Sequence, residues 1–209
     1  MSEAKTPKIQ ELVIASNNAG KVAELKQMLA PLGIRVFAQN AFGLPSPEET
    51  GLTFIENAIL KARFVAQETG KPALADDSGL CVPALGGAPG IYSARYSSDI
   101  VGEQANDASN NAKLINVLRE RDLENTSAYY VCALALLRHA DDPEPLISIG
   151  RLQGQIQFTA QGEGGFGYDP HFYLPKYQQT AAQLGKAKKN TISHRALALQ
   201  QLVIELKEC

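Results

Sequence analysis

The stretch LVIASNNAGKVAELKQML, Leu12–Leu29, contains a predicted strand, turn and helix, and this order indicates the fold class. Its four apolar residues Leu12–Ala15 predict a short strand, and SNNAG at Ser16–Gly20 predicts a turn. From Lys21 onward the apolar residues recur at helical spacing as far as Leu29, before a proline and a glycine end the helix. A strand that leads directly into a helix favours an α/β fold.

The remainder of the chain continues to alternate strand-like and helix-like segments. Thr53 and Glu56 predict a capping box at the start of the clearest helix, in which each side chain bonds to a free backbone N–H. We expect strands at Arg35–Ala38, Ala73–Ala75, Ser127–Leu137 and His171–Leu174, and one or two more within Leu146–Phe158. We expect helices at Thr53–Thr69, at 108–121, from Thr180 and at Ser193–Lys207. No repeat or change of composition divides the chain, so we expect one domain over residues 1–209, of one or two lobes.

Composition excludes several classes of protein. The 209 residues carry 44% hydrophobic residues and a net charge of −2, so a large core is possible and no general attraction to nucleic acid or anionic lipid is expected. No apolar run approaches the roughly 20 residues of a membrane helix, and the polar Met1–Gln10 segment does not resemble a secretory signal. Cys81, Cys132 and Cys209 are too dispersed for a zinc site or a disulfide framework. We therefore expect a cytoplasmic protein without a membrane or nucleic-acid partner.

The turn at Ser16–Lys21 is a candidate phosphate site. A helix N-terminus offers unpaired N–H groups and the positive end of a dipole, both of which favour an anion. Lys21 would oppose that dipole unless an anion binds beside it. The alternative is an ordinary asparagine-rich turn with a solvated lysine, and the spacing of glycines is not that of a P-loop.

The sequence Asp76-Asp77-Ser78-Gly79 follows the strand expected at Ala73–Ala75. The two adjacent carboxylates point to opposite sides if the strand persists through them, so we expect only one of them to enter a site. Carboxylates that leave room for several waters are how proteins hold Mg²⁺ against a polyphosphate. Glu48 and Glu49 are candidates for a second oxygen ligand, whereas the alternative for all four is a solvated surface position.

Two segments near the C-terminus are candidates for recognising a flat ligand. In GGFGYDP, Gly164–Pro170, glycines flank aromatic residues, which permits close approach to a base and stacking on it. The alternative is a hairpin loop whose Phe and Tyr pack inward. Lys186, Lys188 and Lys189 precede Ser193-His194-Arg195, a donor-rich cluster suited to a keto oxygen or a phosphate, or else a solvated basic helix start.

Taken together and in this order, these motifs resemble the inosine triphosphate pyrophosphatases, enzymes that act on non-standard purine nucleotides, in their bacterial form. The resemblance covers nearly the whole chain. It rests on SNNAGK at Ser16–Lys21, EETGLTFIENAILKAR at Glu48–Arg63, ADDSGL at Ala75–Leu80, LGGAPGIYSARY at Leu85–Tyr96, GGFGYDP at Gly164–Pro170 and SHR at Ser193–Arg195. Many bacterial relatives have Thr where this chain has Ser16, and both residues offer a hydroxyl.

The resemblance implies an α/β fold with an elongated central mixed β-sheet flanked by helices, two lobes with the active-site cleft between them, and a homodimer. It implies Mg²⁺ as the cofactor, held by Glu49 and Asp77, with Asp77 also the proton acceptor. The substrate contacts that it implies are Ser16, Asn17, Asn18, Ala19, Gly20, Lys21, Lys61, Ser78, Phe166, Gly167, Tyr168, Asp169, Lys189, His194 and Arg195. Among these, Asn18, Lys21 and Lys61 would hold the phosphates, and residues 166–169, Lys189, His194 and Arg195 would form the base pocket.

The expected activity is hydrolysis of ITP, dITP and XTP at the α–β phosphate bond to the monophosphate and pyrophosphate, which cleanses the nucleotide pool. A 6-keto oxygen would accept from Arg195, His194 or a backbone N–H, and the 6-amino group of adenine would not. Two alternatives stay open: a pyrophosphatase for other modified nucleotides, such as pyrimidines, and a nucleotide-binding module without catalysis.

Overall fold

A computed structural model describes residues 9–208, so Met1–Lys8 and Cys209, including part of the polar N-terminal segment considered above, lie outside the described residues. Its strands form one sheet in the order β2-β1-β3-β4-β5-β6-β7. The strands are β1 (Glu11–Ile14), β2 (Arg35–Ala38), β3 (Ala73–Cys81), β4 (Thr126–Leu137), β5 (Leu146–Ile156), β6 (Phe172–Leu174) and β7 (Gln179–Thr180). The α-helices are α1 (Ala19–Leu29), α2 (Phe54–Thr69), α3 (Ser98–Val101), α4 (Asp107–Arg119), α5 (Lys186–Ile192) and α6 (His194–Glu208). Within this range no helix is both long and apolar enough to cross a membrane.

The sheet is mixed. Strand β1 pairs in parallel with β2 and with β3, whereas β6 pairs antiparallel with both β5 and β7. The short connection between β4 and β5 cannot form a parallel crossover, so these neighbouring strands are antiparallel as well. An α/β fold with a central mixed sheet is therefore confirmed.

The chain divides into two compact units. Among the described residues, unit 1 contains 9–77, 132–150 and 195–208, and unit 2 contains 78–131 and 151–194. The boundaries fall inside β3, β4 and β5, so each of these three strands contributes residues to both units.

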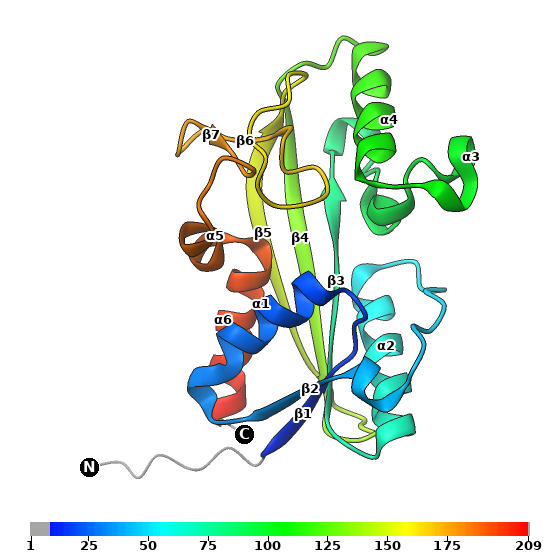
Figure 1. Ribbon diagram of the computed structural model, residues 1–209, viewed down its shortest axis with the longest axis vertical. Helices are drawn as coiled ribbons and strands as arrows, with labels where there is room; N and C mark the ends of the chain where they lie inside the picture. Colours follow the sequence, from blue (N-terminus) through cyan, green and yellow to red (C-terminus); the bar gives the residue numbers. More distant parts are fainter. Residues whose placement is uncertain (1–8, 209) are drawn as a thin grey trace. The chain divides into compact units, whose positions relative to one another are not determined.

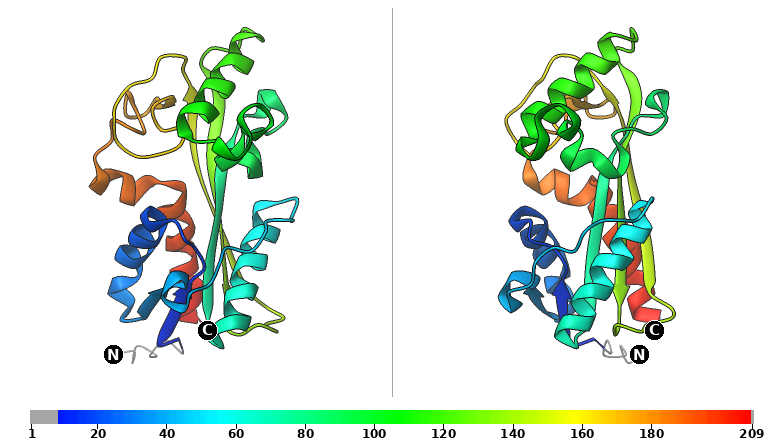
Figure 2. Two further views of the ribbon diagram at one scale, coloured as in Figure 1. Left: turned by 45° about the vertical axis from the view of Figure 1, so that its right-hand side comes forward. Right: turned by 90° about the vertical axis from the view of Figure 1, so that its right-hand side faces the viewer.

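In unit 1, helices cover both faces of the sheet (Figures 1 and 2). Alternate residues of β1 point to opposite faces: Leu12 and Ile14 pack with α1 and α6, and Val13 packs with α2. The α2 side of the sheet is lined mainly by alanines, which meet the buried alanines of α2 itself. Small residues on both partners permit close contact between α2 and the strands of unit 1.

In unit 2, helix α4 supplies most of the helical packing. Its apolar residues Leu114, Ile115 and Leu118 are buried against strand residues that include Tyr130 and Phe172. An asparagine cap, Asn106, begins this helix through a capping box with Ser109. The same helix carries polar residues toward the loop that follows β5, as described below.

Most predicted elements are confirmed, and three details were wrong. The strand expected at Ala73–Ala75 continues to Cys81, so Asp76 and Asp77 lie inside a strand and not at its end. At Thr180 a short strand, β7, replaces the expected helix, and the next helix begins at Lys186. Thr53 does cap α2, but the Glu56 carboxylate accepts from the Leu52 N–H and not from that of Thr53, so the capping box is incomplete.

Candidate active site

The continuous strand β3 fixes the directions of the two adjacent aspartates. Because side chains alternate along a strand, Asp76 and Asp77 point to opposite faces of the sheet. Asp77 meets α2, and Asp76 meets α1 and α6. The expectation that they face different ways if the strand persists is therefore confirmed.

Asp77 belongs to a buried ion-pair cluster in unit 1. Lys61 Nζ, from α2, donates to Asp77 Oδ1 at 2.8 Å and to Glu49 Oε1 at 2.8 Å. Asn57, one helical turn earlier on α2, lies with its Nδ2 at 3.4 Å from Asp77 Oδ2, and its Oδ1 accepts from the Gly51 N–H. Helix α2 thus orients both the aspartate and the loop that carries Glu49.

The electrostatics of this cluster follow from its burial. Burial raises the pKa of Asp77 above its ordinary value, and the positive charge of Lys61 opposes that shift. Burial would lower the pKa of Lys61, but Asp77 and Glu49 more than compensate and raise it. The lysine therefore remains an ammonium ion between two acidic side chains.

The donor set is suited to a magnesium ion. Both carboxylates bond to one Nζ atom, so their oxygens converge on a single point, which is the arrangement that two ligands of one cation need. Among the side chains that the structure describes there is no group of three or more His, Cys, Asp or Glu that could form an all-protein cage. Two carboxylates with the remaining positions left to water and phosphate match the way Mg²⁺ is usually held.

On the other face of β3, Asp76 is enclosed by cations. Its Oδ1 accepts from Lys21 Nζ at 2.5 Å, and its Oδ2 accepts from Arg195 Nε at 2.7 Å and from Cys132 Sγ at 3.0 Å. Burial alone would raise the pKa of Asp76, but Arg195 and Lys21 hold it well below its ordinary value. This carboxylate is thus a fixed negative charge that orients both basic side chains.

Arg195 is the largest fully buried side chain, with 1% of its surface exposed. Besides its bond to Asp76, it pairs through Nη1 with Glu24 of α1. Its Nη2 is buried and has no hydrogen-bond partner among the described residues. One buried donor of this guanidinium is therefore available to a ligand.

The SNNAGK segment forms the start of α1. Asn18 is the N-cap, and its Oδ1 accepts from the Lys21 N–H at 3.0 Å. Ser16 Oγ accepts from the Asn18 N–H, and Asn17 Nδ2 donates to Ser46 Oγ. Ala19 and Gly20 form the exposed first turn of the helix, so the segment is a helix start that presents backbone N–H groups to solvent.

The glycine-rich loop in unit 2 is held by Asp169. Its Oδ2 accepts from the Phe166 N–H at 3.0 Å and from Lys189 Nζ of α5. The ring of Phe166 is 47% exposed, and Lys189 Nζ lies 5.2 Å from its centroid. Gly165 has a φ of 81°, and a Cβ there would lie 2.0 Å from Asp169 Oδ2, so only glycine is compatible with this arrangement.

The two aromatic residues of the loop differ. Tyr168 is only 3% exposed, packs in the unit 2 core and donates to the Ser93 carbonyl at 2.8 Å, as the inward-packing alternative predicts. Phe166 remains the exposed ring. His194 stacks on Tyr130 with ring centroids 4.9 Å apart, and Ser78 follows Asp77 in β3 at a half-buried position.

Several residues that hold these clusters together were not among the predicted site residues. Glu24 lies three residues after Lys21 on the same helix. Asn57 is a polar residue at a buried position of an otherwise apolar helical face, and this exception to the pattern could have been noticed in the sequence. Asp107 and Asn111 of α4 bond to the backbone of Gly167, and no feature of the sequence indicates that contact. Asp76 was considered only as the aspartate that stays outside the site.

Comparisons with known proteins show which family the chain is similar to. The model of the Ham1 family matches residues 12–205. A dITP/XTP pyrophosphatase of Ralstonia nicotianae is 52% identical over 199 residues, covering 95% of this chain and 98% of its own, and one of Xylella fastidiosa is 54% identical over 194 residues, covering 93% and 96%. The solved structure of a HAM1 protein from Coxiella burnetii is similar with a TM-score of 0.89 and 47% identity, covering 96% of this chain and 100% of that one.

Proposed function

The chain belongs to the Ham1 family, and from that premise we propose that it hydrolyses ITP, dITP and XTP between the α and β phosphates. The products are the nucleoside monophosphate and pyrophosphate, and the reaction removes non-standard purines from the nucleotide pool. The names of the curated relatives, dITP/XTP pyrophosphatases at 51–54% identity, support this substrate class.

The convergence of Asp77 and Glu49 on one ammonium group is the observation that carries the proposal. We propose that these two carboxylates hold Mg²⁺, and that Lys61, already bonded to both, contacts the phosphates of the bound nucleotide. When bound, the metal neutralises charge on the phosphate oxygens and stabilises the leaving pyrophosphate. In this proposal Asp77 Oδ2, which lies 3.4 Å from Asn57 Nδ2, orients the attacking water or accepts its proton.

The start of α1 supplies the phosphate contacts in this proposal. Ser16, Asn17, Asn18, Ala19 and Gly20 present hydroxyl, amide and backbone N–H donors, and Lys21 adds a full positive charge. Because Asp76 holds Lys21 Nζ in place, the ammonium group is oriented before substrate arrives. Ser78, next to Asp77 in β3, is a further substrate contact in this proposal.

In this proposal the base is recognised by residues of the glycine-rich loop, by Lys189 and His194, and by Arg195. The exposed Phe166 ring offers a stacking surface, with Gly167 permitting close approach and Tyr168 holding the loop in the core. Asp169, Lys189 and His194 supply polar groups. The buried Nη2 of Arg195, which lacks a partner among the described residues, is a donor suited to a 6-keto oxygen and mismatched to a 6-amino group.

A substrate panel tests the proposal. ITP, dITP, XTP, ATP, GTP, dUTP and methylated pyrimidine triphosphates would be incubated with enzyme and Mg²⁺, and pyrophosphate and orthophosphate assayed separately. Pyrophosphate from ITP, dITP and XTP, abolished by EDTA, is the expected result. Orthophosphate as the first product would overturn α–β cleavage, preference for pyrimidines would favour the alternative substrate class, and no product at all would favour a binding module.

We also propose that the protein is a cytoplasmic homodimer. In unit 2, η4 (Gly90–Arg95) and the adjacent α3 expose the apolar side chains Tyr92, Ile100 and Val101. Large exposed apolar side chains on two elements that are consecutive in the chain favour contact with another protein. Sedimentation analysis of the wild-type protein and of Ile100→Lys tests whether a second copy covers them.

A further inference from the structure

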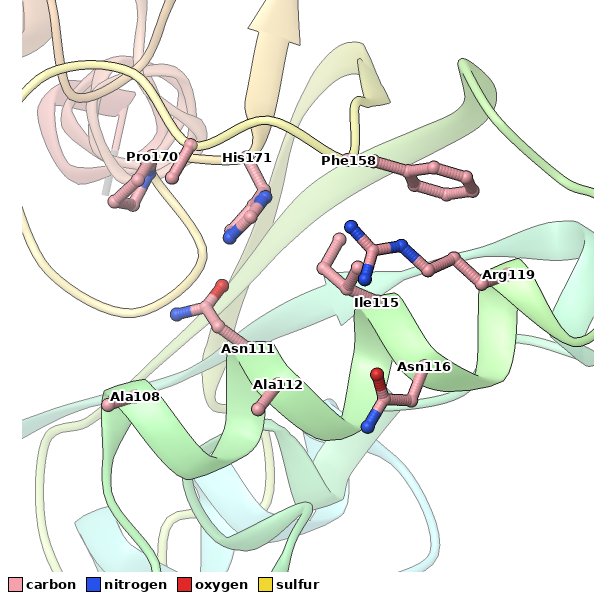
Figure 3. Close-up of a pocket in the computed structure, with 10 residues that line it drawn as sticks. Ala108, Asn111, Ala112, Ile115, Asn116, Arg119, Phe158, Pro170 and His171 are labelled. Atoms are coloured by element: carbon pink, nitrogen blue, oxygen red, sulfur yellow. The ribbon is translucent and has the colours of Figure 1, made fainter.

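A cavity of about 470 Å³ lies in unit 2 beside helix α4, outside every residue assigned to the substrate above (Figure 3). One wall is α4, and the other is formed by Phe158 and the segment that ends at Pro170 and His171. This volume is within the range of small-molecule sites. Polar groups from three residues, Asn111, His171 and Arg119, point toward the space between the two walls (Figure 3).

Asn111 presents a buried acceptor to this cavity. Its Nδ2 donates to the carbonyls of Asp107 at 2.7 Å and Gly167 at 2.8 Å, so the orientation of the amide is fixed. Its Oδ1 is buried and has no hydrogen-bond partner among the side chains and backbone groups that the structure describes. Since an unsatisfied buried acceptor costs about 1–3 kcal/mol, a ligand that brings an O–H or N–H to this atom is favoured.

His171 presents a second acceptor. Its Nδ1 lies 2.9 Å from the Gln157 carbonyl oxygen, which can only accept, so Nδ1 carries the hydrogen. In the neutral form of the ring Nε2 is then bare, and Figure 3 shows the ring directed toward Asn111 and the cavity. Two acceptors on one side of the cavity call for a ligand with more than one hydroxyl or N–H donor.

Arg119 supplies positive charge at the other end of the cavity. Its guanidinium lies over the Phe158 ring, 5.4 Å from the centroid. None of the ion pairs between described residues includes it. The residues that line the cavity include no Asp or Glu. An arginine without a carboxylate partner in an otherwise uncharged wall favours a planar or tetrahedral anion such as a phosphate.

We propose that this cavity binds a phosphorylated ribose, as the free sugar phosphate or within a nucleoside monophosphate, and that it is separate from the catalytic site. The phosphate lies at Arg119, and ribose hydroxyls donate to Asn111 Oδ1 and His171 Nε2. This inference does not depend on the proposed catalytic function. Since Asn111 also holds the Gly167 carbonyl, a ligand here contacts a residue that fixes the glycine-rich loop.

Calorimetric titration of the full chain without triphosphate tests the proposal with four probes: ribose 5-phosphate, IMP, inosine and inorganic phosphate. The variants are Arg119→Gln, which removes the charge, and Ala112→Phe, which fills the cavity from an exposed position of α4. Arg121→Gln is the matched control, because this arginine is exposed, follows the same helix and does not line the cavity.

Ribose 5-phosphate is expected to bind the wild-type chain and the control, and to bind each cavity variant about tenfold or more weakly, as the loss of a charge-assisted hydrogen bond predicts. Inosine and inorganic phosphate are expected to bind weakly, because each lacks one half of the ligand. If both cavity variants also weaken IMP binding, the nucleoside monophosphate is a ligand of the cavity as well. If IMP binding is unchanged in both variants, IMP binds elsewhere and the free sugar phosphate is the ligand of the cavity. Absence of ribose 5-phosphate binding, or binding that both cavity variants retain, would overturn the proposal.

Discussion

Asp76 and Arg195, which are 119 residues apart in the chain, form an ion pair of 2.7 Å in which both side chains are buried. Lys21 bonds to the second oxygen of the same carboxylate. Removing one partner from a buried ion pair leaves an uncompensated charge, which typically costs about 3–5 kcal/mol. We therefore expect Asp76→Asn to reduce the free energy of unfolding by an amount of that order.

Urea denaturation followed by circular dichroism measures this loss. Asp141→Asn is the control, because Asp141 is an exposed aspartate of the same unit and its replacement is expected to change stability by less than about 0.5 kcal/mol. Equal stability of Asp76→Asn and the wild type would show that the enclosed carboxylate has no structural role.

Asp77→Asn separates chemistry from binding. The amide keeps the shape of the side chain, and Lys61 retains its bond to Glu49, so ITP is still expected to bind. If Asp77 is a metal ligand and the proton acceptor, as proposed, its replacement is expected to lower kcat by about 10²–10⁴-fold. Single-turnover kinetics with a parallel measurement of the ITP dissociation constant would check both statements, and near-normal turnover would remove Asp77 from the mechanism.

Glu49→Gln tests whether the second carboxylate holds the metal. Loss of one of two charged ligands is expected to raise the Mg²⁺ concentration needed for half-maximal activity by about tenfold or more. The neighbouring Glu48 is exposed and makes none of the contacts of the site, so Glu48→Gln is a matched control. Magnesium titrations of the two variants that coincide would exclude Glu49 as a ligand.

The elements of unit 1 could be predicted because local signals determine them. Arg35–Ala38 is a strand as expected, and Thr53 caps its helix as expected. Strand β3 was predicted too short, because Asp76-Asp77-Ser78-Gly79 has the composition of a turn. Pairing with oppositely charged side chains from α1, α2 and α6 makes these aspartates compatible with a buried strand, and such long-range contacts leave no local signal.

In the candidate site, too, residues within local motifs could be predicted and contacts between distant segments could not. Lys21, Lys61, Glu49 and Asp77 could be identified from their motifs, and the structure brings three of them together in one cluster. The partners of Arg195 could not be predicted, because the contacts join segments that are distant in the chain. The polar bonds from α4 to Gly167 were unpredictable for the same reason.

Arg195→Lys tests selectivity without removing the positive charge that Asp76 requires. Lysine lacks the Nη2 donor, which is buried and has no partner among the described residues. If that donor serves the 6-keto oxygen, the ratio of kcat/KM for ITP over ATP should fall by about 5- to 150-fold, corresponding to about 1–3 kcal/mol. A ratio equal to that of the wild type would show that Arg195 acts only through its ion pairs.

Gly165→Ala tests the glycine-rich loop, with Gly86→Ala as its control. Both glycines have positive φ, 81° and 66°, so alanine strains the backbone at either position by about 1–2 kcal/mol. Only at residue 165 would the new Cβ collide with other atoms, at 2.0 Å from Asp169 Oδ2 and 2.8 Å from Lys189 Nζ. At residue 86 nothing lies within 4 Å.

Both variants should lose the stability that backbone strain costs, and Gly165→Ala should lose more because of the collision; only Gly165→Ala should lose activity. The collision displaces the Asp169–Lys189 pair that holds Phe166, so Gly165→Ala is expected to raise KM for ITP about tenfold or more, as misplacement of a substrate-positioning group does. Gly86→Ala is expected to keep the wild-type KM. Because backbone strain is common to both, equal KM values would mean that the loop around Phe166 does not contact the substrate.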